Sequence, residues 1–413
     1  MRYGLIGGKL GHSYSREIHA LAGGYDYELR EIAPEELGAF LEKRDFLGIN
    51  VTIPYKQAVI PYLDETDALA REIGAVNTIV NRGGKLMGFN TDFTGLKNLI
   101  LHNGIVLSGR KVLILGSGGT SRTARAVARA LGAGSVIIAG RTAKPGVVSY
   151  DEACSVHCDA QVMINTTPCG MYPDVLSTPV SLEPFRCLEA LVDVIYNPLR
   201  TRFVMEAQRR GIRSCNGLYM LASQGVAASA LFLDAPMKEE KALSVYRQLY
   251  RQKRNIVLTG MPGSGKSTTG KILAERLGMA FADTDDLIMR QTGRHPAQII
   301  REDGEEAFRE IESGIVREIS AASDTVVSTG GGVILREENM SCLRGNGIVF
   351  FIDRDIRDIV PYSDRPLSDT REKLEETYRR RYPVYCSTCD FRIKAGASCE
   401  ETADLIMEAA DEV

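Results

Sequence analysis

The sequence has 413 residues, of which 44% are hydrophobic and 25% charged, and its formal net charge is -3 at pH 7. This length exceeds one ordinary domain, so we expect two or three domains. The charge balance argues against a nucleic-acid partner, and the sequence has neither the apolar stretch of a membrane span nor a signal peptide. We therefore expect a soluble globular protein in the cytoplasm.

The nine cysteines favour free thiols over disulfides, because their number is odd and they are scattered along the chain. Two short stretches could suggest a metal site: CSVHC, with Cys154, His157 and Cys158, and CSTC, with Cys386 and Cys389. Neither stretch has a second ligand pair nearby, as a four-ligand zinc site requires. We therefore predict no cysteine metal site.

Residues 1–100 alternate short apolar segments with helical segments, which is typical of an α/β domain. The expected strands are RYGLIG, YELREI, GINVTI and AVNTIVN, and PEELGAFLEK has helical spacing. We expect this domain to be completed by helical residues from about 225–252.

Residues 101–224 have the order of a Rossmann-like domain. The strand KVLILG is followed by a glycine-rich turn, the helix TSRTARAVARALGA and the strand SVIIAG. Glycines in such a turn let the backbone approach a pyrophosphate at the helix N-terminus. The expected cofactor-binding residues of the turn are Gly116, Ser117, Gly118, Gly119, Thr120 and Ser121.

The residues after SVIIAG favour NADP(H) over NAD. A fold that prefers NAD has an acidic residue about 20 positions past the glycines, but residues 122–149 contain no Asp or Glu. Arg141, Thr142 and Lys144 occur there instead, and a guanidinium suits a 2′-phosphate. The alternative is that Arg141 is a solvated loop charge.

A polar amphipathic segment, MKEEKALSVYRQLYRQKR, ends near Arg254 and marks the expected boundary of a third domain at 254–413. This domain opens with the strand NIVLTG and the motif GMPGSGKS, and a helix follows. The motif is typical of a P-loop, in which Lys266 reaches the β- and γ-phosphates and Ser267 binds Mg²⁺. The expected ATP-binding residues are Gly260, Gly263, Ser264, Gly265, Lys266, Ser267 and Thr268.

Residues from about 1 to 250 resemble the shikimate dehydrogenase family in four motifs that occur in the family's order: GHSYS, NVTIPYK, GAVNT and NTD. The resemblance implies NADPH-dependent reduction of 3-dehydroshikimate to shikimate. It implies that Ser13 and Ser15 bind the substrate carboxylate and that Lys56 and Asp92 form the catalytic pair. The further substrate ligands that it implies are Thr52, Asn77, Asp92, Tyr196 and Gln224.

The chemistry of ketone reduction explains these residue types. Hydride transfer leaves an alkoxide that an ammonium can protonate, and a carboxylate can hold that ammonium in place. The sequence departs from the family at Arg16, where proline is common, and at Phe93, where glycine is common. These departures put the local loop shape in question and leave the polar ligands intact.

Residues from about 254 to 395 resemble shikimate kinase, which implies ATP-dependent phosphorylation of shikimate. The matching segments are FADTDDLI, GEEAFREIE, STGGG, DRPL and YRRRYPVY. Asp283 would bind Mg²⁺ through water and Asp285 the acceptor hydroxyl. The other implied residues are Arg309 and Arg381 for the carboxylate, Gly331 in the pocket and Arg365 for the phosphates. The motif leaves open which of Arg380 and Arg381 faces inward, and the segment before Arg365 is shorter than the family's lid.

Two alternatives remain at this point. One is an NAD-dependent quinate/shikimate dehydrogenase fused to a kinase for another small acid. The other is a fusion in which one half has lost its activity and serves as a binding module. The missing acidic residue after SVIIAG argues against the first, and the presence of the catalytic residues argues against the second.

Overall fold

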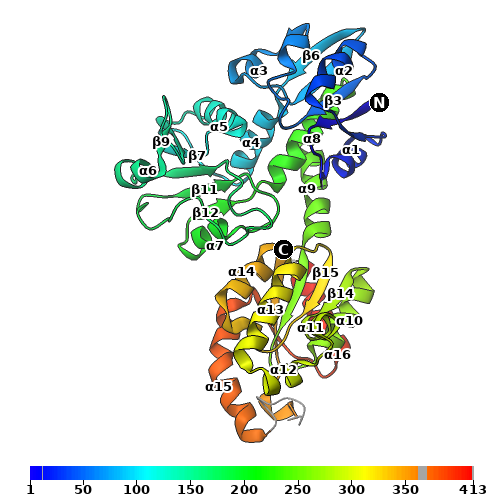
Figure 1. Ribbon diagram of the computed structural model, residues 1–413, viewed down its shortest axis with the longest axis vertical. Coiled ribbons are helices and arrows are strands. Elements are labelled where there is room, and N and C mark those ends of the chain that lie inside the picture. The colour runs from blue at the N-terminus through cyan, green and yellow to red at the C-terminus, as the bar shows by residue number, and fades with distance from the viewer. Residues whose placement is uncertain (12, 361–369, 412–413) are drawn as a thin grey trace. The chain divides into compact units, whose positions relative to one another are not determined.

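The computed structural model describes residues 1–11, 13–360 and 370–411. They divide into two compact units (Figure 1). The first unit comprises Met1–Gly170, Thr178–Tyr196 and Phe203–Tyr250, and the second comprises Met171–Ser177, Asn197–Arg202 and Arg251–Val413. No helix in the described ranges is long and apolar enough to cross a membrane.

The first unit begins with a mixed sheet of six described strands in the order β2-β1-β3-β5-β6-β4. The strands are β1 (Tyr3–Gly7), β2 (Glu28–Glu31), β3 (Gly48–Val51), β4 (Glu65–Thr66), β5 (Thr78–Arg82) and β6 (Lys85–Phe89). β1 and β3 are parallel and wholly buried, which explains their continuous apolar sequences. β5 and β6 form a hairpin whose turn glycines, Gly83 and Gly84, both have positive φ.

Short helices accompany this sheet. They are α1 (Ser15–Gly23), η1 (Pro34–Glu36), α2 (Leu37–Lys43), η2 (Ile60–Tyr62) and α3 (Ala68–Ile73). The predicted helix PEELGAFLEK thus forms η1 and α2, and its buried side chains are Leu37 and Leu41.

The second sheet of this unit has six described strands, all parallel, in the order β12-β11-β10-β7-β8-β9. They are β7 (Lys111–Leu115), β8 (Ser135–Gly140), β9 (Val148–Ser149), β10 (Val162–Asn165), β11 (Ala190–Asp193) and β12 (Arg213–Cys215). The strand order reverses at β7, between β8 and β10. In open parallel sheets this reversal marks the crevice where ligands bind.

The remaining helices of this part of the chain are α4 (Thr91–His102), α5 (Gly119–Ala130), α6 (Tyr150–Val156), α7 (Arg202–Arg209), α8 (Leu218–Phe232) and α9 (Glu239–Lys253). α4 and α8 lie side by side between the two sheets of the first unit (Figure 1). They approach closely because Gly95 of α4 has no side chain: a Cβ there would lie 2.5 Å from the Met220 carbonyl oxygen.

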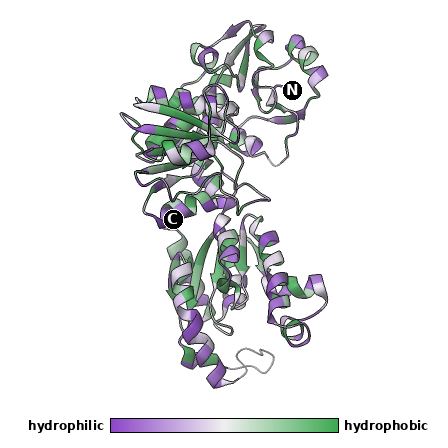
Figure 2. Ribbon diagram, turned by 60° about the vertical axis from the view of Figure 1, so that its left-hand side comes forward, coloured by the Kyte–Doolittle hydropathy of each residue, from purple (hydrophilic) through white to green (hydrophobic). Residues whose placement is uncertain are grey.

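The second unit has a parallel sheet of five described strands in the order β14-β15-β13-β16-β17. They are β13 (Asn255–Thr259), β14 (Ala280–Asp283), β15 (Thr325–Ser328), β16 (Gly347–Asp353) and β17 (Phe391–Lys394). β13 lies in the centre, so the loop that follows it starts at the point where the strand order reverses. In Figure 2 the strands are coloured mainly hydrophobic and much of the helical surface hydrophilic.

Helices cover the faces of this sheet, and the last helix follows β17. They are α10 (Lys266–Leu277), α11 (Thr284–Thr292), α12 (Pro296–Glu302), α13 (Glu305–Ser320), η3 (Val333–Leu335), α14 (Glu337–Asn346), η4 (Ile356–Asp358), α15 (Arg371–Thr388) and α16 (Cys399–Asp411). The α/β fold predicted from the sequence is confirmed, with parallel sheets in the second half of the first unit and in the second unit.

Candidate active sites

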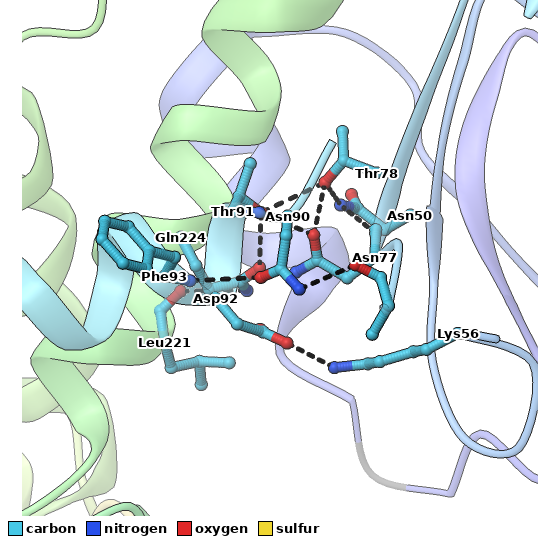
Figure 3. A network of polar contacts seen from close by, with 11 residues as sticks. Asn50, Lys56, Asn77, Thr78, Asn90, Thr91, Asp92, Phe93, Leu221 and Gln224 are labelled. Atoms are coloured by element: carbon cyan, nitrogen blue, oxygen red, sulfur yellow. Dashed lines mark hydrogen bonds and ion pairs between the residues drawn. The ribbon is translucent and has the colours of Figure 1, made fainter. Parts of the chain in front are cut away.

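An ion pair between Lys56 and Asp92 lies at the centre of the first candidate site (Figure 3). Lys56 follows β3, and Asp92 lies in the first turn of α4, whose N-cap is Asn90. Lys56 Nζ donates to Asp92 Oδ2 at 2.5 Å, and the two side chains are 26% and 14% exposed. The ammonium is therefore oriented by a carboxylate and still open to a substrate.

Asn77 is held beside this pair by three hydrogen bonds to its carbonyl oxygen. Oδ1 accepts from the Thr91 N–H at 2.7 Å, the Thr91 hydroxyl at 3.2 Å and the Thr78 hydroxyl at 3.1 Å. The Thr91 hydroxyl also contacts Gln224 Oε1 at 3.4 Å, so α4 links Asn77 to α8 (Figure 3). The donor side of the Asn77 amide is consequently turned away from these threonines.

The remaining predicted substrate ligands lie on other segments of the first unit. The Ser13 hydroxyl donates to the Ser15 hydroxyl at 3.0 Å, so the structure brings this pair together. Thr52 follows β3, and its N–H donates to the Ile6 carbonyl at 3.0 Å. Tyr196 packs edge-on against Tyr14 with centroids 6.1 Å apart, and burial raises its pKa.

The two departures from the family pattern are accommodated in helix N-termini. Arg16 lies in the first turn of α1, and its Nε donates to the Tyr27 carbonyl at 3.3 Å. The Phe93 N–H donates to Asn90 Oδ1 at 3.2 Å, and in Figure 3 its ring points away from Lys56. Neither residue displaces the polar side chains around the ion pair.

The glycine-rich turn between β7 and α5 has the form that a pyrophosphate site needs. Gly116 has φ 105°, and a Cβ there would lie 2.7 Å from Thr166 Oγ1, so glycine is required. A Cβ added at Gly118 or Gly119 would meet none of the described atoms within 4 Å. α5 begins at Gly119, so its N-terminal N–H groups adjoin this open space.

Arg141, Thr142 and Lys144 follow β8 and are exposed. Two buried residues that the sequence interpretation missed lie at the ends of neighbouring strands: Asn165 Nδ2 donates to Asp193 Oδ1 at 3.0 Å. Asn165 Oδ1 accepts from the N–H and the hydroxyl of Thr167, which fixes the loop after β10. Polar residues at the carboxyl ends of adjacent predicted strands were the signal available for finding them.

The P-loop of the second unit follows β13. Gly260, Gly263 and Gly265 have φ of 149°, 83° and 95°, and a Cβ at Gly260 would lie 2.8 Å from the Ile352 carbonyl oxygen. Lys266 Nζ donates to the carbonyl oxygens of Gly260 and Met261, each at 2.9 Å. The lysine is therefore held against the loop that would surround the phosphates.

Hard oxygen ligands suitable for Mg²⁺ lie at the end of this loop. The Ser267 hydroxyl donates to Asp283 Oδ2 at 2.6 Å, and Asp283 Oδ1 accepts from the Asp285 N–H at 3.0 Å. Mg²⁺ is bound in such sites by one or two protein oxygens together with phosphates and water. The residues present fit that cation.

A cavity of about 1020 Å³ adjoins the P-loop and is lined by most of the predicted kinase residues. The predicted residues that line it are Gly263, Gly265, Lys266, Ser267, Thr268, Asp283, Asp285, Arg309, Gly331 and Arg381. Arg365 lies outside the described residues. The cavity is also lined by Glu312 and Arg354, which the sequence interpretation missed.

Two arginines meet at one wall of this cavity. Arg309 Nη1 donates to Glu312 Oε2 at 2.7 Å, and Arg309 Nη2 donates to Glu305 Oε1 at 3.0 Å. Arg381 is 2% exposed, and its Nε and Nη2 have no hydrogen-bond partner among the described residues. Burial lowers its pKa. Arg380 is exposed, so Arg381 is the one that faces the cavity.

The three glycines at 330–332 complete this wall, and a side chain at any of them would have to displace a neighbour. A Cβ at Gly330 would lie 2.9 Å from Glu312 Oε1, one at Gly331 would lie 2.7 Å from the Pro262 ring, and one at Gly332 would lie 2.2 Å from an Arg309 nitrogen. The loop thus brings its backbone against both the P-loop and the arginine. This arrangement places two buried arginines, of which Arg309 is paired with Glu305 and Glu312, beside a phosphate-binding loop.

Comparisons with known proteins agree with this geometry. Residues 5–79 match the shikimate dehydrogenase substrate binding domain, and residues 262–411 match shikimate kinase. Shikimate dehydrogenase (NADP(+)) of Clostridium beijerinckii is 34% identical over 261 residues, which cover 59% of this chain and 96% of the relative. The chain belongs to the shikimate dehydrogenase family. The shikimate kinase domain follows the dehydrogenase part on the same chain.

Further relatives of the dehydrogenase support the same assignment. Shikimate dehydrogenase (NADP(+)) of Geobacillus kaustophilus is 40% identical and covers 55% of this chain and 90% of its own length. A crystal structure of a chorismate mutase/shikimate 5-dehydrogenase fusion protein from Clostridium acetobutylicum has a TM-score of 0.57 and 35% identity. It covers 60% of this chain and 96% of its own. Shikimate 5-dehydrogenase of Thermus thermophilus, solved with NADP(H) and shikimate, has a TM-score of 0.54 and 32% identity, with coverage of 60% and 99%.

Proposed function

We propose that this chain catalyses two consecutive reactions of the shikimate pathway. The first unit reduces 3-dehydroshikimate to shikimate with NADPH, and the second phosphorylates shikimate with MgATP to shikimate 3-phosphate. The proposal rests mainly on two sites in one chain: an ammonium–carboxylate pair in the unit that holds the dinucleotide turn, and a cavity with two buried arginines beside a P-loop.

In the dehydrogenase, bound NADPH would supply the hydride. Lys56 would protonate the oxygen of the reduced carbonyl, and Asp92 would keep the ammonium oriented and bind a ring hydroxyl. Ser13 and Ser15 would bind the carboxylate, and Thr52, Asn77, Tyr196 and Gln224 the rest of the substrate. The hydrogen bonds around Asn77 support this assignment, because they fix its amide before the substrate arrives.

The cofactor would be held by the turn at 116–121 and by the loop after β8. The N–H groups at the start of α5 would bind the pyrophosphate, and Arg141, Thr142 and Lys144 the 2′-phosphate. The exposure of these three residues supports the proposal, since a 2′-phosphate must reach them from solvent. NADPH is favoured over NADH because only NADPH has a 2′-phosphate for these residues to bind. The absence of an acidic residue at 122–149 favours NADPH as well.

In the kinase, the P-loop residues would bind the ATP phosphates, with Ser267 on Mg²⁺ and Asp283 acting through water. Asp285 would bind the acceptor hydroxyl, and Arg309 and Arg381 would bind the carboxylate with Gly331 beside it. Arg365 would approach the transferred phosphoryl group. The unpaired guanidinium nitrogens of Arg381 support the carboxylate assignment, because a buried cation requires an anionic partner.

We further propose three domains at 1–100, 101–224 and 254–413, with helical residues from about 225–252 completing the first, and a cytoplasmic location. The close packing of α8 on α4 supports the return of the chain to the first domain. Cytoplasmic substrates and cofactors support the location.

Two assays on the purified chain test this function. Loss of NADPH absorbance with 3-dehydroshikimate measures the first step, and the same assay with NADH tests the NAD-dependent alternative. ADP release with shikimate and MgATP measures the second step, and quinate in place of shikimate tests another acceptor. Equal rates with NADH, or ADP release without shikimate 3-phosphate, would contradict the proposal.

A further inference from the structure

A buried tyrosine of the kinase domain contacts both loops of its cavity. Tyr385 lies on α15, one turn after Arg381, and is 0% exposed. Its hydroxyl donates to the carbonyl oxygens of Gly260, at 2.9 Å, and Gly331, at 2.5 Å, so its one proton is shared between the two loops. The positive charge of Arg381 favours the ionised form of this phenol, but burial has the larger effect on its pKa.

The two carbonyl groups belong to the loops that would hold the two substrates. Gly260 begins the P-loop, and its carbonyl oxygen also accepts from Lys266 Nζ at 2.9 Å. Gly331 lies in the glycine loop that packs against Pro262 and Arg309. One phenol oxygen therefore contacts both the nucleotide loop and the acceptor loop.

The surroundings hold this phenol in one position and one protonation state. Its ring stacks on Phe351 of β16 with centroids 4.8 Å apart and planes 12° from parallel. Burial raises the pKa of Tyr385 well above its ordinary value, so the hydroxyl remains a donor at physiological pH. A fixed ring and a permanent proton are what a positioning group needs.

We infer that Tyr385 is a positioning residue of the kinase, whose hydroxyl keeps the P-loop and the glycine loop in the mutual arrangement required for phosphoryl transfer. It touches neither substrate in this role. Its removal should therefore affect the alignment of the reacting atoms more than the binding of either substrate alone. Misplacement of reacting groups by about 1 Å can cost on the order of 100-fold in rate.

The test compares Tyr385→Phe with Tyr382→Phe in the full chain. Both variants remove a phenol hydroxyl from α15 and keep the ring. Tyr382 packs edge-on against the same Phe351, but its hydroxyl donates to the Asp353 carboxylate at 3.5 Å instead of to a loop carbonyl, so it is the matched control. The thermal transition of the kinase unit, identified by its shift with MgATP, gives the amount of folded kinase in each sample.

We expect Tyr385→Phe to lower the kinase kcat about 10- to 100-fold, with separate affinities for MgATP and shikimate within about threefold of the parent. Tyr382→Phe should keep kcat within about twofold. A Tyr385→Phe kcat within threefold of the parent would overturn the inference, as would an equal loss in the control. A large loss of shikimate affinity at unchanged kcat would also overturn it, since the phenol would then serve only Arg381.

A measurement on the parent chain keeps the inference testable if Tyr385→Phe does not fold. Shikimate alone should slow amide hydrogen exchange in residues 260–266, because the phenol connects the acceptor loop to the P-loop. Unchanged exchange there would overturn the inference. It rests on the proposed kinase activity, and the two fail separately: a parent chain that makes no shikimate 3-phosphate contradicts the proposed function, whereas an active parent with an active Tyr385→Phe variant contradicts only this inference.

Discussion

Lys56 and Asp92 are 36 positions apart in the sequence, yet their side chains form a hydrogen-bonded ion pair. Replacing Lys56 by alanine removes the proposed proton donor and leaves the cofactor turn untouched. We expect ketone reduction to fall by about 100- to 10,000-fold, the usual contribution of a positioned acid, with NADPH affinity nearly unchanged. Steady-state reduction and cofactor titration measure the two quantities. Lys85→Ala removes an exposed lysine from β6 of the same unit and serves as control. Reduction by Lys56→Ala within tenfold of the parent would remove Lys56 from the catalytic role.

Arg141 distinguishes the two nicotinamide cofactors by charge. In Arg141→Ala the proposed partner of the 2′-phosphate is lost, and one charge-assisted hydrogen bond is worth about 1.5 to 3 kcal/mol. The affinity for NADPH should therefore fall about 10- to 100-fold, while that for NADH stays close to the parent value. Fluorescence titration with each cofactor measures the two affinities.

The control is Arg129→Ala, which changes an exposed arginine at the other end of α5 and should alter neither affinity. Equal losses for both cofactors in Arg141→Ala would assign Arg141 a structural role.

At the scale of elements, the glycine loop at 330–332 depends on the absence of side chains. A Cβ at Gly332 would lie 2.2 to 2.5 Å from the guanidinium of Arg309, so Gly332→Ala must displace that arginine. We expect shikimate affinity to fall at least about tenfold through loss of a charge-assisted contact, with ATP affinity retained, as measured by calorimetric titration. Gly314→Ala is the control, because a Cβ at this position of α13 meets nothing within 4 Å in the described structure. Unchanged shikimate binding in Gly332→Ala would show that Arg309 does not bind the substrate.

α1 and α8 pack around a histidine that is neutral in the folded protein. His19 is 2% exposed and stacks on Tyr27 at 4.0 Å, and burial lowers its pKa from 6.5 to about 3. Below pH 6.5 the unfolded chain binds a proton at this residue that the folded chain does not, so stability rises with pH from about 3 to 6.5. The loss on acidification approaches about 1.4 kcal/mol for each pH unit.

His19→Phe removes this titration and keeps an aromatic ring in the stack. The pH dependence of the dehydrogenase transition, identified in calorimetry by its shift with NADPH, should therefore be shallower below pH 6.5 in the variant than in the parent. Identical pH profiles would show that His19 is protonated in the folded protein.

The sequence predicted those elements whose patterns are local. The buried strands β7, β13 and β16 and the partly buried β8 appear as apolar segments, and the P-loop and dinucleotide turn are contiguous motifs. Short or half-exposed strands such as β4, β9 and β17 carry no comparable signal, because pairing with neighbours stabilises them. Tyr385 was missed because its role arises from a contact with Gly260, 125 positions away, which no local pattern reveals. Glu312 is only 3 positions from Arg309, but this spacing alone does not show that the pair lines the cavity.

At the scale of the whole molecule, each unit carries its own sheet systems and its own candidate site. Separate hydrophobic clusters support this division: one includes Leu113, Met163 and Leu191 of the first unit, and another includes Val257, Val327 and Phe351 of the second. The two chemistries should therefore fail independently, because compact units with their own cores retain their folds when a residue in the other is changed.

One chain should perform both steps in sequence, and a coupled assay that follows both products tests this directly. The purified full chain is given 3-dehydroshikimate, NADPH and MgATP, and NADPH consumption, shikimate and shikimate 3-phosphate are followed in the same sample. The parent should convert 3-dehydroshikimate to shikimate 3-phosphate. Lys266→Ala should consume NADPH at the parent rate and accumulate shikimate, since only the kinase loses its phosphate-binding lysine. A parent chain that stops at shikimate, or a folded Lys266→Ala variant that loses both activities, would contradict the account.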